Sequence, residues 1–222
     1  MNKVKINIIK KGAGIIHHNG YNNTGVSEIL SIAKIPKGSF YFYFKNKEDF
    51  GLEVIEYYAD QLFRIVDKHT DNIYNSPIEN LSNCFEDYYS YLQSLDKYNG
   101  CPISNLSQEM SSLNENMRGR LNEINIELRK KIAFFIKEAQ SRFSISDKVN
   151  VKECASFILN TWAGALIQLK LTKNDLPYKE FKKQMFEDYI GYITVDPSLE
   201  IVIENPDKQI VKKKKLSFLR RK

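Results

Sequence analysis

The chain has 222 residues, of which 42% are hydrophobic, and its formal net charge is +6. This apolar fraction supports a packed core and excludes global disorder, and no apolar run approaches the roughly 18 residues that a membrane span needs. Three cysteines, Cys84, Cys101 and Cys154, are odd in number and far apart, which argues against a disulfide framework or a zinc site. Because the N-terminus lacks a signal-peptide apolar region, we expect a cytoplasmic protein with no membrane partner. We also expect no metal or other cofactor.

Charge is distributed unevenly along the chain. Residues 1–50 carry a net +5, residues 51–205 carry −6 and residues 206–222 carry +7. A positive N-terminal segment on an acidic body is typical of a DNA-binding head whose body is not attracted to DNA. We therefore predict three parts: a head over residues 1–50, a body over residues 51–196 and a basic tail over residues 197–222.

The sequence of the head predicts three helices. Apolar spacing indicates a first helix over about residues 4–19 and a second that has Thr24 as its N-cap and ends before Pro36. A short third helix over about residues 37–43 follows, with Phe40 and Phe44 on its core side. The other side of this helix presents lysine, serine and aromatic side chains, which suit the major groove of DNA.

This segment resembles the DNA-binding domain of the TetR (tetracycline repressor) family of bacterial transcription regulators. An ordered series of residues carries the resemblance: Gly20, Tyr21, Thr24, Val26, Ile29, Lys37, Gly38, Ser39, Phe40, Tyr41, Phe44, Lys45, Asn46, Lys47 and Glu48. Two positions depart from the family, which often has glycine at Lys34 and a hydroxyl cap at Pro36. Since a left-handed non-glycine residue costs about 1–2 kcal/mol, we expect a slightly reshaped turn at Lys34.

The resemblance implies a set of residues that contact double-stranded DNA: Thr24, Lys37, Gly38, Ser39, Tyr41, Phe42, Tyr43 and Lys47. Thr24, Tyr41 and Lys47 are expected to donate to phosphates, Lys47 with the help of a helix N-terminus. Lys37 and Ser39 would reach base edges, with guanine as the partner of lysine. Gly38 would let the backbone approach closely, while Phe42 and Tyr43 would touch thymine methyls or the sugar–phosphate wall. The alternative for Tyr41 is a partly buried core tyrosine.

The body predicts six further helices, over about residues 47–70, 78–98, 102–109, 115–143, 147–171 and 177–194. The fold class is therefore all-α, with about nine helices. In the TetR family the last two helices pack against a second copy, so the resemblance implies a homodimer formed by the Trp162–Leu171 and Phe181–Ile193 segments. Alternating residues after position 198 predict a short β-hairpin. The basic end is either a solvated tail or extra affinity for DNA.

A small-molecule effector is expected in a cavity of the body. The candidate lining residues are Tyr88, Leu92, Cys101, Leu106, Met110, Phe135, Phe157, Thr161 and Trp162. Such walls suit an amphipathic or aromatic molecule, although ordinary core packing is the alternative for each residue. Cys101 precedes Pro102 at a helix N-terminus, where a thiolate is stabilised.

Residues 99–109 and 162–165 also resemble one TetR subgroup with a Gly-Cys-Pro motif. Some similar regulators sense electrophiles or oxidants through a cysteine in this motif. The alternative is that Cys101 is a small buried hydrophobic residue.

These patterns predict a DNA-binding transcriptional regulator. It would be a homodimeric repressor that binds a palindromic operator and is released by a small-molecule or electrophile effector. An all-α interaction protein and an enzyme are the alternatives. We find no nucleophile–base set, phosphate loop or metal cluster that would support an enzyme.

Overall fold

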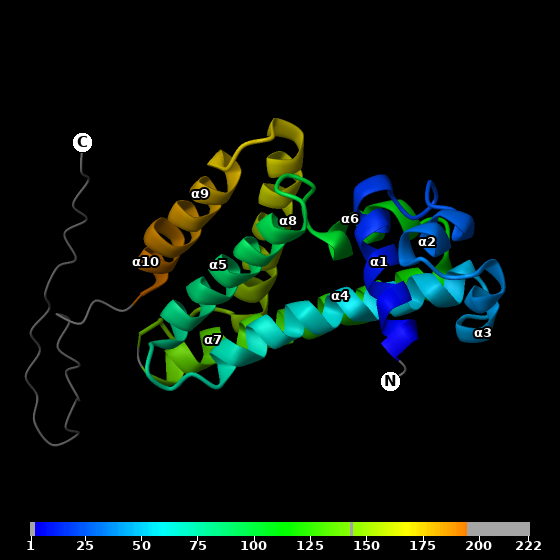
Figure 1. Cartoon of the computed structure of the whole chain (residues 1–222). Helices are drawn as coiled ribbons and strands as arrows, with labels where there is room; N and C mark the ends of the chain where they lie inside the picture. The colour runs from blue at the N-terminus through cyan, green and yellow to red at the C-terminus, as the bar shows by residue number, and fades with distance from the viewer. Residues whose placement is uncertain (1–2, 143, 195–222) are drawn as a thin grey trace, which may run out of the picture.

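The computed structural model describes residues 3–142 and 144–194, which form an all-helical fold without a named strand (Figure 1). The helices are α1 (Lys3–Asn19), α2 (Val26–Ala33), η1 (Lys37–Ser39), α3 (Phe40–Tyr43), α4 (Lys47–Thr70), α5 (Pro77–Leu95), α6 (Pro102–Met110), α7 (Glu115–Ser141), α8 (Val151–Thr172), α9 (Leu176–Lys182), η2 (Lys183–Tyr189) and α10 (Ile190–Ile193). The all-α prediction with about nine helices is confirmed, because α9, the π-helical η2 and α10 follow one another as one rod. The predicted β-hairpin lies outside the described residues.

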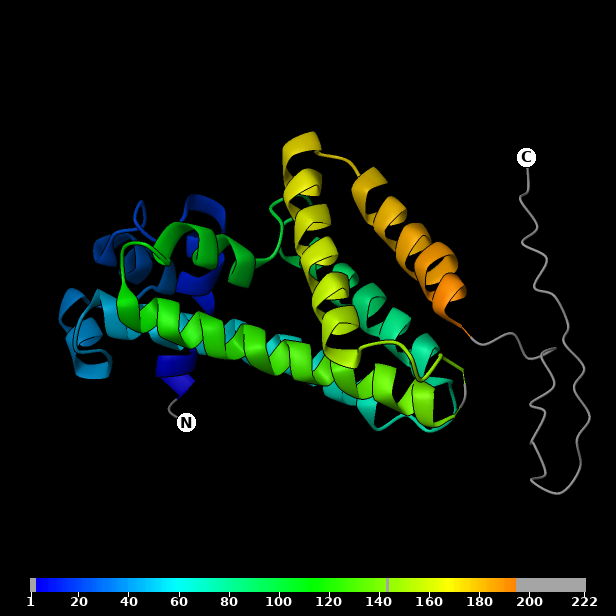
Figure 2. The same ribbon diagram turned by 180° about the vertical axis from the view of Figure 1, so that it is seen from behind.

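The helices α1 to α3 form a head at one end, and α4 runs from this head into the body (Figure 1). Helix α7 runs alongside α4 in the same direction (Figure 2). The two are joined along their length by Glu48–Asn116 (2.7 Å), a bidentate Glu56–Arg120 pair and Asp67–Lys131 (2.5 Å). The helices α5, α8 and α9–α10 complete the body. No helix among the described residues is long and apolar enough to cross a membrane.

Three phenylalanines fasten the head to α4. The rings of Phe40, Phe44 and Phe50 are almost fully buried, and their centroids lie 5.0–5.6 Å apart in tilted or edge contacts. Such aromatic pairs add about 0.5–1.5 kcal/mol beyond the area they bury. The core placement predicted for Phe40 and Phe44 is thus confirmed, and Phe50 carries the cluster into the long helix.

The turn between α2 and η1 keeps a left-handed residue although that residue is lysine. Lys34 has φ 57° and ψ 47°, and the Ile35 N–H donates to Leu30 O at 3.0 Å as in a normal helix C-terminus. The reshaping expected at Lys34 is therefore absent. At the other end of α2 the cap prediction is wrong, because Gly25 is the N-cap and Thr24 donates its hydroxyl to Gly20 O at 2.7 Å.

Helix α1 packs closely on α4 through Gly12. A Cβ built on Gly12 would lie 2.4 Å from Phe50 Cζ, whose buried ring has no free space, whereas nothing lies within 4 Å of a Cβ on Gly14. We expect Gly12→Ala to destabilise the fold by about 1–3 kcal/mol through overpacking. Gly14→Ala should stabilise it by up to about 1 kcal/mol through helix propensity.

Chemical denaturation of the two variants beside the wild-type chain measures this difference. Each replacement adds one methyl group to the same helix. Changes of equal sign and size would contradict the close approach at Gly12.

Candidate nucleic-acid interface and effector cavities

The recognition turn, formed by η1 and α3 over residues 37–43, lies at the outer end of the head (Figure 1). Tyr41 is 67% exposed and Phe42 is 79% exposed, while Ser39 and Tyr43 are half-buried. This exposure excludes the alternative that Tyr41 is a core residue. Gly38 is exposed, and a Cβ there would meet nothing within 4 Å, so the fold itself does not require glycine at that position.

Two of the predicted phosphate contacts are engaged inside the protein. Lys47 donates from Nζ to Tyr21 O at 2.7 Å, and its ammonium lies 4.4 Å from the centroid of the Tyr21 ring. Burial lowers the pKa of Lys47. Thr24 has no exposed surface, and its hydroxyl donates a hydrogen bond to Gly20 O. The structure therefore contradicts the prediction that Thr24 contacts a phosphate, because its side chain closes the loop before α2 instead.

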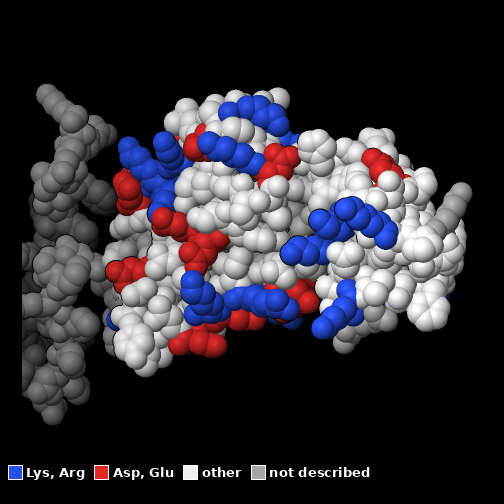
Figure 3. Space-filling view, viewed as in Figure 1, with Lys and Arg blue, Asp and Glu red and all other residues white. Residues whose placement is uncertain are grey.

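Charge on the surface follows the division into head and body. On the face drawn in Figure 3, the head carries mainly basic side chains, whereas acidic and basic side chains lie close together over the body. Lys10, Lys11 and Lys45 are exposed on the head. Such a distribution attracts the head, and not the body, to a polyanion.

The larger cavity of the body, about 550 Å³, opens between α6, α7 and α8. Of the residues predicted to line a pocket, it collects Tyr88, Cys101 and Trp162. The remaining wall combines apolar side chains with a polar side: Ser104, Ser107, Gln108, Ser111, Arg118, Asn122, Asn125 and Asn160. Sequence reasoning missed this polar side. The polar residues on α6 and α7 are spaced like those of a solvent-exposed helix face. Only the packing of α8 beside them shows that they line a cavity.

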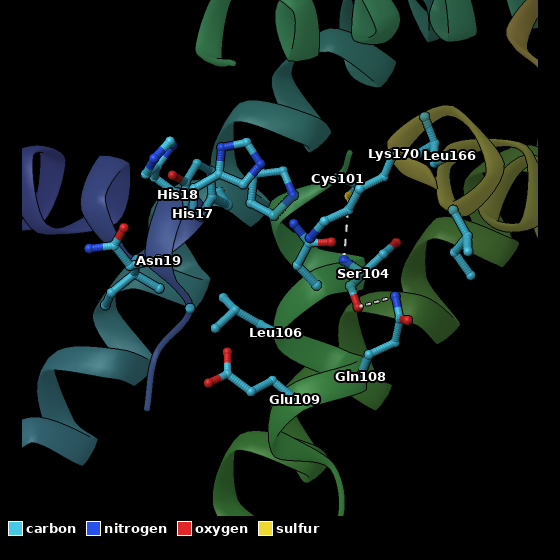
Figure 4. A pocket seen from close by; sticks show the side chains of 16 residues that line it. His17, His18, Asn19, Cys101, Ser104, Leu106, Gln108, Glu109, Leu166 and Lys170 are labelled. Atoms are coloured by element: carbon cyan, nitrogen blue, oxygen red, sulfur yellow. Dashed lines mark hydrogen bonds between the residues drawn. The ribbon is translucent and has the colours of Figure 1, made fainter. Parts of the chain in front are cut away.

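A second cavity, about 420 Å³, lies where the head meets the body (Figure 4). His17 and His18 of α1 line one side, and Leu166 and Lys170 of α8 line another. Helix α6 separates the two cavities, and Cys101 lines both of them. Leu106 belongs to this junction cavity and not to the larger one.

The remaining predicted pocket residues are not at the larger cavity. Leu92, Met110 and Phe135 are buried at 2–4% exposure, as expected for core packing. Phe157 is 48% exposed on the outer face of α8 and packs on Tyr189, with ring centroids 4.8 Å apart. Thr161 lines a separate groove beside α9. These five placements correct the prediction: Leu92, Met110 and Phe135 are core residues of α5, α6 and α7, and Phe157 and Thr161 lie on a part of α8 that does not line the larger cavity.

Cys101 is the N-cap of α6 and is 6% exposed. Its Sγ accepts the Ser104 N–H at 3.5 Å and lies 3.1 Å from the Tyr88 hydroxyl. Burial and the neighbouring thiol hold the pKa of Tyr88 well above its ordinary value, so this phenol stays neutral. Burial raises the pKa of the Cys84 thiol to about 12 and also raises the pKa of the Cys154 thiol.

The loop before α6 joins the body to the end of α1. The Asn99 amide donates to His17 O, His17 Nε2 pairs with Gly100 O at 3.1 Å, and Asn105 Nδ2 donates to Asn99 O at 2.8 Å. Gly100 has φ +74°, which favours glycine. Burial lowers the pKa of His17, so the imidazole is neutral at pH 7 and its ring N–H can donate to the carbonyl.

The two segments predicted to form the homodimer interface, Trp162–Leu171 and Phe181–Ile193, contribute partly to the core of the subunit. Trp162 is 4% exposed and packs its ring on Phe85 and Phe181, each with centroids 5.1 Å away. These residues hold α5, α8 and α9 together within one subunit, so Trp162 and Phe181, the first residues of the two predicted dimer segments, are core residues. Helix α8 keeps an outward stripe instead, in which Phe157, Gly164 and Leu171 recur every seven residues and Leu171 is 74% exposed.

A helix-turn-helix head joined by one long helix to a helical body with cavities defines a bacterial DNA-binding regulator. Residues 8–54 match the family model of bacterial regulatory proteins, tetR family, and residues 77–185 match the tetracyclin repressor-like C-terminal domain. The transcriptional repressor DhaR of Mycobacterium sp. (strain GP1) is 30% identical over 184 residues, which cover 83% of this chain and 91% of DhaR. The transcriptional regulator AcuR of Cereibacter sphaeroides is 30% identical over 183 residues, 82% and 84% of the two chains.

Solved structures agree with this assignment. The regulatory protein TetR from Rhodobacter sphaeroides is 29% identical with a TM-score of 0.78, covering 87% of this chain and all of the other. The reduced form of NemR from Escherichia coli has a TM-score of 0.74 at 22% identity, over 89% and 100% of the two chains, and supports the fold alone. The chain belongs to the TetR family, and it is a ligand-responsive, DNA-binding transcriptional regulator.

Proposed function

We propose that the chain is a homodimeric repressor that binds a palindromic operator and is released by a small molecule in the larger cavity. The carrying observation is that α4 and α7, which are joined by side-chain contacts along their length, reach from the recognition turn to the cavity wall. The relatives DhaR and NemR are described as repressors, which favours repression over activation. Two heads would read half-sites about one helical turn, roughly 34 Å, apart.

The chemistry of the larger cavity favours an amphipathic effector. Tyr88 and Trp162 offer aromatic surface, while the serine and asparagine side chains of α6 and α7 offer donors and acceptors. Arg118 is already paired with Glu115, so the lining brings little unpaired charge. The effector needs only different affinities for two positions of the heads, and a tenfold change in DNA affinity corresponds to about 1.4 kcal/mol.

A gel shift with the DNA upstream of the chain's own coding sequence tests the proposed function. The full chain should retain one duplex from this region, while unrelated competitor DNA should not displace it. Failure to select any sequence would contradict a repressor and favour an interaction protein that does not bind DNA.

Cys101 supports a second route of release, in which an electrophile or oxidant reacts with its thiol. We infer this role from its place in the Gly-Cys-Pro motif and its position between the two cavities. If the role is correct, N-ethylmaleimide should release the wild-type chain from the selected duplex, and Cys101→Ser should resist release. Cys154→Ser is the matched control, because that buried thiol lines neither cavity. Equal release of the wild-type chain and Cys101→Ser would exclude this route.

A further inference from the structure

Glu109, near the end of α6, holds the loop between α1 and α2. Its Oε2 accepts the Tyr21 N–H at 2.8 Å, and its Oε1 accepts the Asn22 N–H at 2.7 Å. Hydrogen bonds to a charged acceptor are about twice as strong as neutral ones. A Cβ on Gly20, where φ is +89°, would lie 3.2 Å from the same carboxylate. Glycine therefore leaves the room that this clamp needs.

Tyr21 is held from its opposite side by Lys47. The Lys47 ammonium donates to Tyr21 O at 2.7 Å and lies over the Tyr21 ring. The ring is 7% exposed and packs on α4, where a Cβ on Gly51 would lie 2.6 Å from Tyr21 Cε2. Tyr21 thus joins the carboxylate of α6 to the ammonium at the start of α4.

We propose that Glu109 is a positioning residue for DNA binding. By clamping two consecutive amides it fixes the Tyr21 carbonyl, and this carbonyl aims the Lys47 ammonium. An ammonium has three donors, so two remain for a DNA phosphate once one is used on Tyr21 O. This proposal rests on the proposed function, because it requires the start of α4 to face the operator.

The same helix also lines the larger cavity with Ser104, Ser107 and Gln108. Its two ends therefore serve different parts of the molecule, since Cys101 caps one end and Glu109 clamps the head near the other. A molecule that displaces α6 from the cavity side would shift the clamp. DNA affinity would then change without any movement within the α4–α7 pair.

The sign of a mutational effect separates positioning from simple electrostatics. Removing an acidic group near bound DNA strengthens binding if only its charge matters. Removing the clamp should weaken binding, because Lys47 loses its fixed direction. Glu109→Gln makes this change with little alteration of shape. Glu115→Gln is the matched control, since it also removes one acid, from an exposed position on α7 that pairs with Arg118.

The experiment measures affinity of the full chain for the duplex that wild type selects from its own upstream DNA, at one salt concentration. We expect Glu109→Gln to bind about three- to tenfold more weakly, and Glu115→Gln to bind equally or slightly more tightly. In the Lys47→Ala background the effect of Glu109→Gln should disappear, since the clamp acts through Lys47. Hydrogen exchange at the Tyr21 and Asn22 amides should be faster in Glu109→Gln alone.

The outcomes separate this proposal from the proposed function. A wild-type chain that selects no duplex contradicts the function itself. A wild-type chain that binds, with Glu109→Gln equally tight or tighter, overturns the positioning role and leaves the function standing. A full loss from Glu109→Gln that persists in the Lys47→Ala background, or unchanged amide exchange, overturns it as well.

Discussion

Tyr41→Ala is expected to lower affinity for the operator about 10- to 100-fold while leaving the subunit folded. The side chain is 67% exposed and makes an edge contact with the Phe40 ring, so its removal leaves no buried cavity. The phenol would donate to a phosphate, and phosphates carry no sequence information. Binding to operator and to unrelated duplex should therefore weaken alike, as fluorescence anisotropy at fixed salt would show.

Tyr74→Ala provides the matched control, because this tyrosine is 93% exposed in the loop between α4 and α5, at the end of α4 that lies away from the head. It should bind DNA like the wild-type chain. Lys37→Ala should relax the preference for the operator instead of lowering all affinities equally, since Lys37 is expected to read a base. The assignment of the recognition turn is wrong if Tyr41→Ala and Tyr74→Ala behave identically.

Gly164→Glu is expected to convert a dimer into monomers and to lower operator affinity by about 100-fold or more, because two linked heads bind far more tightly than one. Gly164 lies in the middle of the outward stripe of α8, and nothing in its own subunit lies within 4 Å of a Cβ there. A charged side chain would keep a second α8 from approaching closely, without disturbing the subunit. Sedimentation velocity measures the state of assembly.

Gly119→Glu makes the same change in α7, at a position where a Cβ would also meet open space. Both substitutions change helix propensity equally. A difference in assembly state between the two variants therefore depends only on where the glutamate lies. Gly119→Glu should remain dimeric. If Gly164→Glu also remains dimeric and binds the operator normally, the proposed α8 interface is wrong.

The sequence by itself determined the helices and the class of regulator. The spacing of apolar residues depends on local geometry, so the bounds of α4 and the end of α2 at Ala33 followed directly from the periodicity and from Pro36. The recognition turn was equally local, because its aromatic and lysine residues lie within seven positions of one another. The burial of Phe40 and Phe44 followed from the same short pattern.

Only the tertiary structure decided which wide apolar faces are core. Helix α8 carries apolar residues almost all round, so its periodicity could not show that Trp162 points inward and Phe157 outward. The sequence predicted Thr24 as a helix cap and a donor to phosphate. In the structure, packing of the loop before α2 buries Thr24, and its hydroxyl donates to Gly20 O. The Glu109 clamp joins residues 87 and 88 positions apart. Contacts between residues so far apart in the sequence depend on how the helices pack together, and they cannot be predicted from short-range periodicity.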